Sequence, residues 1–253
     1  MDAHAQYERD GFFRIEGFAD AETCSSMLDR VVDIARRAAA GEDVRPAFVL
    51  PESNLAGRPG NPEDLVSKIF RLHRDPVFET FATDPRVTDV VADVLDAPEV
   101  DCFLSQFIFK APGAWGQPWH QDSYYFPFEP ARPVVGIWLA VTEATLDNGC
   151  LSVVAGSHTE PIHEHVPDRR PGANYGYVEI VDHDMSAAQP VLMQPGDLLV
   201  FDSHLMHRST DNVSDGIRAA MVYHYAAAGT KDLTLARQRH SINDWMPARR
   251  LPA

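Results

Sequence analysis

The stretch Gln117-Pro118-Trp119-His120-Gln121-Asp122 contains the most informative pattern of the chain, a histidine and an aspartate separated by one residue. On an extended strand, residues i and i+2 point to the same face of the sheet. An imidazole and a carboxylate would then project side by side, as metal ligands do. A His-x-Asp pattern also occurs by chance at protein surfaces, so its meaning depends on the segments that follow it.

A second histidine-containing segment lies further along the chain, at residues 202–209 after a predicted strand over 197–201. One histidine from this segment would complete a set of two imidazoles and one carboxylate, which suits non-haem Fe(II) and leaves three coordination positions open. Strand geometry does not choose between His204 and His207, because they are three residues apart.

An arginine follows this segment at a position suited to binding an anion. Arg218 begins a predicted strand over 218–225, across a turn from His207. A guanidinium beside a metal can hold the distal carboxylate of a co-substrate through two parallel hydrogen bonds. His224 is in phase with Arg218 by the strand period of two, so it would face the same side.

The region around these motifs predicts a mainly β core preceded by helices. From about Val100 the segments become short, β-branched and aromatic, with turn residues between them. Helices followed by many short strands indicate an antiparallel double sheet with helices packed on one side. The predicted strands cover residues 102–110, 134–142, 151–154, 191–193, 197–201 and 218–225.

The first hundred residues are predicted to be mostly helical. Asp20 is expected to cap a helix over about 21–40, and Asp84 with Pro85 is expected to begin a second one. Residues 45–62 are rich in Pro, Gly and Asn and are predicted to be a long loop. We expect a single domain over 1–253: a helical part over about 1–98, a core over about 99–228 and a C-terminal extension over 229–253.

Composition excludes several classes of protein. The 253 residues include 22 Lys+Arg and 37 Asp+Glu, a net charge of −15, which argues against partners with a phosphate backbone or an anionic membrane surface. The three cysteines are odd in number and form no Cys-x-x-Cys, which favours a reducing compartment. No signal peptide or long apolar run is present, so a cytoplasmic location is expected.

The stretch 120–128, followed by Trp138, by residues 148–151 and by 156–158, resembles the phytanoyl-CoA dioxygenase family of Fe(II)- and 2-oxoglutarate-dependent oxygenases. The resemblance is clear over about residues 100–225 and weaker in the N-terminal helical part. It implies a double-stranded β-helix, or jelly roll, as the core of the fold. It also implies Fe(II), 2-oxoglutarate and O₂ as the cofactor and co-substrates.

The resemblance further assigns roles to individual residues. It implies that His120, Asp122 and His207 are the catalytic metal ligands, and that Arg218 binds the far carboxylate of 2-oxoglutarate with help from Ser209. Three more residues are implied to line the co-substrate pocket: Gln106, Trp138 and Lys68. The sequence departs from the family at Arg208, where glycine is common.

The resemblance implies an enzyme that hydroxylates an unactivated C–H bond of a small molecule and converts 2-oxoglutarate to succinate and CO₂. By the same resemblance, the carboxylate at Asp122 favours hydroxylation, or a desaturation or cyclisation variant, over halogenation. One alternative is an acyl-CoA 2-hydroxylase, for which four arginines could bind the anionic ligand: Arg132, Arg169, Arg170 and Arg208. Another is a metal-binding jelly roll that does not use 2-oxoglutarate.

Two segments are expected to cover the substrate, residues 45–62 and 159–188. The second contains His163, His165 and His183, which are expected to be solvated. No pattern in the sequence indicates the oligomeric state.

Overall fold

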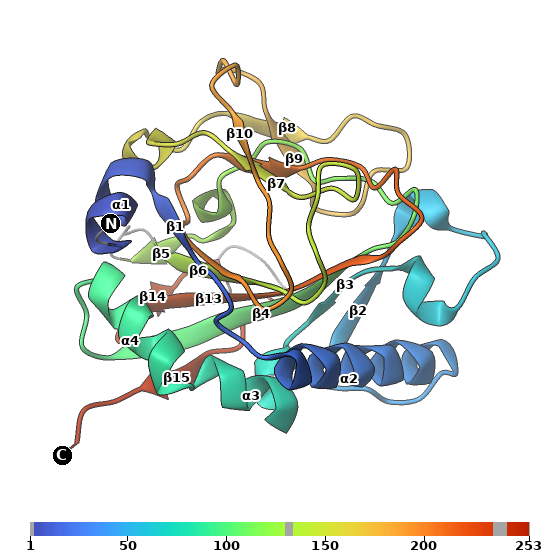
Figure 1. Ribbon diagram of the computed structural model, residues 1–253, viewed down its shortest axis with the longest axis horizontal. Coiled ribbons are helices and arrows are strands. Elements are labelled where there is room, and N and C mark those ends of the chain that lie inside the picture. The colour runs from blue at the N-terminus through green and yellow to red at the C-terminus, as the bar shows by residue number, and fades with distance from the viewer. Residues whose placement is uncertain (1–2, 130–133, 235–241, 253) are drawn as a thin grey trace.

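The computed structural model describes residues 3–129, 134–234 and 242–252, and these form two packed antiparallel sheets with helices on one side (Figure 1). The large sheet has eight strands in the order β1-β11-β6-β13-β4-β3-β2, with β15 also paired to β4. A smaller sheet has the order β10-β7-β12. The prediction of a mainly β fold with flanking helices is confirmed.

The strands of the large sheet are β1 (Phe12–Ile15), β2 (Phe48–Pro51), β3 (Val66–Phe70), β4 (Val100–Lys110), β6 (Val135–Ala140), β11 (Leu198–Asp202), β13 (Arg218–Ala227) and β15 (Met246–Arg249). The small sheet consists of β7 (Leu151–Val153), β10 (Gln189–Val191) and β12 (His207–Ser209). Two short pairs complete the set: β5 (Phe128–Glu129) with β14 (Lys231–Asp232), and β8 (His165–Pro167) with β9 (Val178–Ile180).

The helices begin where their capping residues predict. α2 (Ala21–Ala39) starts after Asp20, whose side chain accepts a hydrogen bond from the Thr23 amide. α4 (Pro85–Val94) starts after Asp84, whose side chain accepts one from the Arg86 amide. The remaining helices are α1 (Ala3–Asp10) and α3 (Pro76–Ala82). Among the described residues, no helix combines the length and apolar character that a membrane span requires.

The residues of β13 alternate between the two sides of the large sheet. Tyr223 and Tyr225 point towards the helices, and their hydroxyls donate to the carbonyls of Phe78 and Ala82 at 3.0 and 2.9 Å. Val222 faces the opposite way, into the apolar cluster that joins the two sheets. In Figure 1, α2, α3 and α4 lie on one side of the large sheet, whereas β8 and β9 lie on the other.

The expectation of a mostly helical first hundred residues is wrong in part, because this region also contributes three strands. β1 pairs with β11, and β3 pairs with both β4 and β2. β2 lies inside the stretch 45–62 that was expected to be a loop. Such short strands carry little periodic signal of their own and are stabilised by the ladder of the longer strand beside them.

The close contact of Gly136 with an aromatic ring gives a prediction about stability. A Cβ at Gly136 would lie 2.2 Å from Phe201, whose ring packs against His207 with a centroid distance of 5.2 Å. We expect Gly136→Ala to lower the free energy of unfolding by about 1–3 kcal/mol through overpacking. Urea unfolding measures this change. Gly216→Ala is the matched control, because nothing lies within 4 Å of its Cβ position, and an equal loss in both variants would contradict the prediction.

Candidate metal centre and co-substrate pocket

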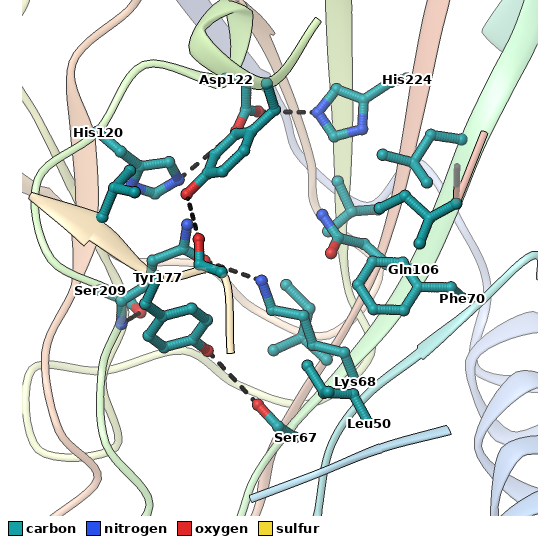
Figure 2. A pocket seen from close by; sticks show the side chains of 18 of the residues that line it. Leu50, Ser67, Lys68, Phe70, Gln106, His120, Asp122, Tyr177, Ser209 and His224 are labelled. Atoms are coloured by element: carbon teal, nitrogen blue, oxygen red, sulfur yellow. Dashed lines mark hydrogen bonds and ion pairs between the residues drawn. The ribbon is translucent and has the colours of Figure 1, made fainter. Parts of the chain in front are cut away.

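A cavity of about 940 Å³ opens beside the large sheet, and all eight predicted site residues line it. They are His120, Asp122, His207, Arg218, Ser209, Gln106, Trp138 and Lys68. Figure 2 shows part of this lining, with Asp122 between His120 and His224 and with Lys68 on the opposite wall. The volume is at the upper end of the range common for small-molecule sites.

Three of these residues form a buried cluster that could hold a metal ion. The Oδ1 atom of Asp122 lies 3.5 Å from Nε2 of His120 and 3.8 Å from Nε2 of His207. Backbone pairing brings the histidines together: the amide of each donates to the carbonyl of the other at 3.0 Å. Two imidazoles and one carboxylate on one face are typical of a non-haem iron centre.

The expectation that His120 and Asp122 share a strand face is wrong. His120 forms only an isolated bridge with His207, and Asp122 begins a 3₁₀ turn, η4 (Asp122–Tyr125). The turn after His120 brings the carboxylate back beside the imidazole. The two side chains therefore converge through a bend in the backbone.

Backbone carbonyls fix the orientation of both imidazoles. The Nδ1–H group of His120 donates to the Pro118 carbonyl at 2.8 Å, and that of His207 donates to the Leu205 carbonyl at 2.9 Å. A proton held on Nδ1 leaves the Nε2 lone pair free, and Nε2 is the atom that faces Asp122. This arrangement is common around histidine ligands of metals.

His224 is a third histidine at this cluster, as its phase with Arg218 predicted. Its Nε2–H group donates to Oδ2 of Asp122 at 2.8 Å, so it binds the oxygen that the other two histidines leave free. His204 does not line the cavity, and its amide donates to the Asp202 carboxylate instead. Of the two histidines that strand geometry left open, His207 is the one that lies in the cluster.

Burial and charge keep the cluster in the protonation state that a cation needs. Burial and the nearby His120 lower the pKa of His207 to about 4, against the opposing effect of Asp122. Burial alone would raise the pKa of Asp122, but His207 and His224 hold it well below its usual value. At neutral pH the imidazole of His207 is neutral and the carboxylate of Asp122 is ionised.

The inner end of the cavity carries a buried guanidinium, that of Arg218, which forms no ion pair with a carboxylate among the described residues. The Arg218 side chain is 1% exposed, and its Nε and Nη1 atoms have no hydrogen-bond partner among the described residues. The indole Nε1 of Trp138 is also buried without a partner there, and the guanidinium lies 5.6 Å from the Trp138 ring centroid. These donors face the same cavity and lack an acceptor.

Lys110 adds a second buried basic side chain that the sequence did not suggest. Its Nζ atom donates to the hydroxyl of Ser209 at 2.7 Å and to the carbonyl of Thr210 at 2.6 Å. Burial, together with repulsion from Arg218, lowers its pKa well below the usual value. Lys110 lies opposite Arg218 in the pairing of β4 with β13, so period two from Gln106 could have identified it.

The opposite wall holds Lys68 together with Tyr175 and Tyr177, which belong to the segment expected to cover the substrate. The Nζ atom of Lys68 donates to the side chain of Gln117 at 2.8 Å and lies 5.0 Å from the Tyr177 ring centroid. Tyr177 is buried, whereas its neighbour Tyr175 is 88% exposed. Both tyrosines line the cavity, as expected if the segment 159–188 covers it.

The outer part of the cavity is mainly apolar. Its apolar residues include Phe48, Leu50, Phe70, Leu104 and Phe126, and Arg71 and Asn243 are among the polar residues of the same cavity. Two of these residues, Phe48 and Leu50, come from β2. The segment 45–62 therefore includes a strand that lines the cavity in addition to its loop.

The arginines that could have bound an acyl-CoA anion do not gather at the cavity. Arg170 is paired with Asp168 at 2.6 Å, and the guanidinium of Arg208 lies over the ring of Trp119 at 4.9 Å. Arg169 is exposed, and Arg132 lies outside the described residues. None of the described arginines of this set lines the cavity.

Solved structures share this arrangement of sheets and helices. The epimerase SnoN, in complex with Fe³⁺, alpha ketoglutarate and nogalamycin RO, has 20% sequence identity and a TM-score of 0.69 over 91% of this chain and 84% of that one. EctD from S. alaskensis, with 2-oxoglutarate and 5-hydroxyectoine, has 23% identity and a TM-score of 0.69 over 88% and 74%. The predicted jelly-roll core is confirmed, and the fold is that of the 2-oxoglutarate-dependent oxygenases.

Sequence comparison specifies the family. The phytanoyl-CoA dioxygenase family matches residues 7–220. Phytanoyl-CoA dioxygenase domain-containing protein 1 of Rattus norvegicus is 30% identical over 89% of both chains. The peroxisomal phytanoyl-CoA dioxygenase of Bos taurus is 32% identical over 88% of this chain and 67% of that protein.

The chain belongs to the phytanoyl-CoA dioxygenase family. It is a non-haem iron dioxygenase that uses Fe(II), 2-oxoglutarate and O₂, as the resemblance implied.

The contact of His224 with Asp122 predicts a loss of metal affinity on substitution. We expect His224→Ala to weaken Fe(II) binding about 10- to 100-fold, because residues that orient a metal ligand commonly have effects of this size. Anaerobic equilibrium dialysis with iron analysis measures the affinity. His204→Ala is the control, since this histidine lies outside the cavity, and equal affinities in both variants would show that His224 does not act through Asp122.

Proposed function

We propose that His120, Asp122 and His207 hold the iron and that Arg218 binds the far carboxylate of 2-oxoglutarate, so that the enzyme hydroxylates a C–H bond of a small, largely apolar molecule. The observation that carries this proposal is the buried guanidinium of Arg218, which has unpartnered donors and lies in the same cavity as the His-Asp-His cluster. A buried cation is costly unless an anion accompanies it.

The residues of the site fit the two groups. The cluster offers three ligand atoms from one side, with both imidazoles held in the tautomer that presents Nε2. A carboxylate between Arg218 and Trp138 would accept from donors that otherwise have no acceptor. Ser209 and Lys110 extend this polar end, while Gln106 and Lys68 line its sides, which supports their roles in holding the co-substrate.

In the proposed mechanism the iron centre, with 2-oxoglutarate and O₂, supplies the oxidation of a substrate C–H bond. The protein contributes position and exclusion of water. Arg218 fixes the orientation of the co-substrate from its far end, and Asp122, held by His224, keeps its carboxylate aimed at the metal position. Tyr177 and the neighbouring segment cover the inner cavity, and the apolar outer part places the substrate near the cluster.

The apolar lining favours an uncharged or weakly polar substrate over an acyl-CoA thioester, because none of the described arginines considered for CoA binding lines the cavity. One apolar cluster packs the helices against the large sheet and another packs the small sheet against its opposite face, which supports a single functional domain.

Removing the proposed anion ligand gives a direct test. In wild-type protein, anaerobic addition of Fe(II) and then 2-oxoglutarate should produce the weak visible absorbance band of the iron chelate. We expect Arg218→Ala to weaken 2-oxoglutarate binding by about 30-fold or more, since truncating one partner of a buried charged pair costs about 2 kcal/mol or more. Asp122→Ala should abolish the band.

Arg208→Ala is the matched control, because this arginine neighbours His207 but stacks on Trp119 outside the cavity. A wild-type protein that binds iron and shows no band would overturn the proposed site.

Substrate class can be tested by succinate release. We expect apolar, uncharged small molecules to stimulate release above the uncoupled rate and acyl-CoA thioesters not to do so, because the lining is largely apolar and none of the described arginines considered for CoA binding belongs to it. The measurement compares both groups at equal concentration with the iron-loaded enzyme. Stimulation by acyl-CoA thioesters alone would contradict the proposed substrate class and leave the metal site intact.

A further inference from the structure

A second cluster of metal-ligating side chains lies outside the cavity, at the base of a hairpin. The hairpin consists of β8 and β9 and the loop between them, and residues 175–178 of this hairpin line the cavity. Glu160 and His163 precede β8, whereas Asp182 and His183 follow β9. The two chain ends of the hairpin meet at these four side chains.

The distances in this cluster match those of a metal coordination shell. Oε2 of Glu160 lies 3.0 Å from Nε2 of His163 and 3.3 Å from Nε2 of His183. Neighbouring ligand atoms around a tetrahedral Zn²⁺ ion lie about 3.4 Å apart when the bonds are about 2.1 Å long. The ligand atoms of these three residues all lie within 4.8 Å of one another.

Asp182 supplies a second and independent feature of such a site. Its Oδ1 atom lies 3.2 Å from Nδ1 of His163, on the other side of the ring from Glu160. A carboxylate that accepts the Nδ1 proton leaves Nε2 as the ligand atom, and this carboxylate–histidine–metal arrangement is common in zinc proteins. The Glu164 amide contacts the other oxygen of Asp182.

We propose that Glu160, His163 and His183 bind a transition-metal ion, with Zn²⁺ as the best fit, and that Asp182 positions His163. Imidazole and carboxylate ligands suit this ion. Its two charges match the two carboxylates of the cluster. Glu160 and Asp182 are partly exposed, with 37% and 45% of their side chains accessible, so a water molecule can take the fourth position.

The metal would join the two ends of the hairpin whose residues line the cavity. The same segment is tied to the iron-ligand turn through Gln121, between His120 and Asp122. The side chain of Gln121 accepts a hydrogen bond from the backbone amide of His163 at 2.8 Å and donates one to the Pro161 carbonyl at 3.1 Å. The backbone amide of Gln121 donates to Nε2 of His165. The second site would therefore stiffen the wall of the cavity without taking part in the oxidation.

Metal content tests the proposal independently of the oxygenase activity. The full chain is stripped with a chelator and dialysed against Zn²⁺, and bound metal is counted by elemental analysis. We expect two equivalents for the wild type, one for His163→Gln/His183→Gln, and one for His120→Ala/His207→Ala. Asp182→Asn should keep the second equivalent with about 10- to 100-fold weaker affinity.

Hydrogen exchange locates the second equivalent. On addition of Zn²⁺, amide exchange in residues 160–183 should slow at least several-fold in the wild type and in His120→Ala/His207→Ala, but not in His163→Gln/His183→Gln. Circular dichroism checks that each variant is folded, and Asp182→Asn provides the test if the double variant is not. Equal metal content in the wild type and in His163→Gln/His183→Gln, or a second equivalent that is unaffected by Asp182→Asn, would overturn the proposal.

Discussion

The site depends on one electrostatic constraint, the burial of the Arg218 guanidinium without a carboxylate partner among the described residues. Burial lowers its pKa only to about 10, so the group remains charged at neutral pH. The sheet that buries it also supplies Lys110 and the unpartnered Trp138 donor. An acidic chain thus keeps a charged guanidinium inside, beside donors that lack an acceptor among the described residues, and this is the basis of the proposal that Arg218 binds an anionic co-substrate.

A single strand, β13, connects this region to the rest of the fold. Successive residues of β13 face the helices and the cavity in turn. Tyr223 and Tyr225 attach the strand to the helices through their hydroxyl hydrogen bonds, while Arg218 and His224 lie at the two ends of the site. The strand pairs with β4 on one side and β6 on the other. Its position at the centre of the sheet fixes the distance between Arg218 and the cluster of His120, Asp122 and His207.

Much of this arrangement was accessible from the sequence, because it follows local rules. Period two placed His224 with Arg218, and capping residues located α2 and α4. The parts that were missed depend on distant partners: β3 is a strand because β4 pairs with it, and Asp122 reaches His120 through a turn. His163 and His183 were expected to be solvated, since only closure of the β8–β9 hairpin brings them together. The role of Lys110 required the register of β4 against β13.

The Nδ1 bonds of His120 and His207 have a consequence for how the centre is loaded. Each ring is held by a carbonyl two residues earlier in its own segment, so its rotamer and tautomer are set locally before any ion arrives. The conformational entropy of ordering these side chains is lost during folding and is not lost again on binding. In the proposed centre the two imidazoles are therefore preorganised, and stripping and reloading the metal should leave the backbone around it essentially unchanged.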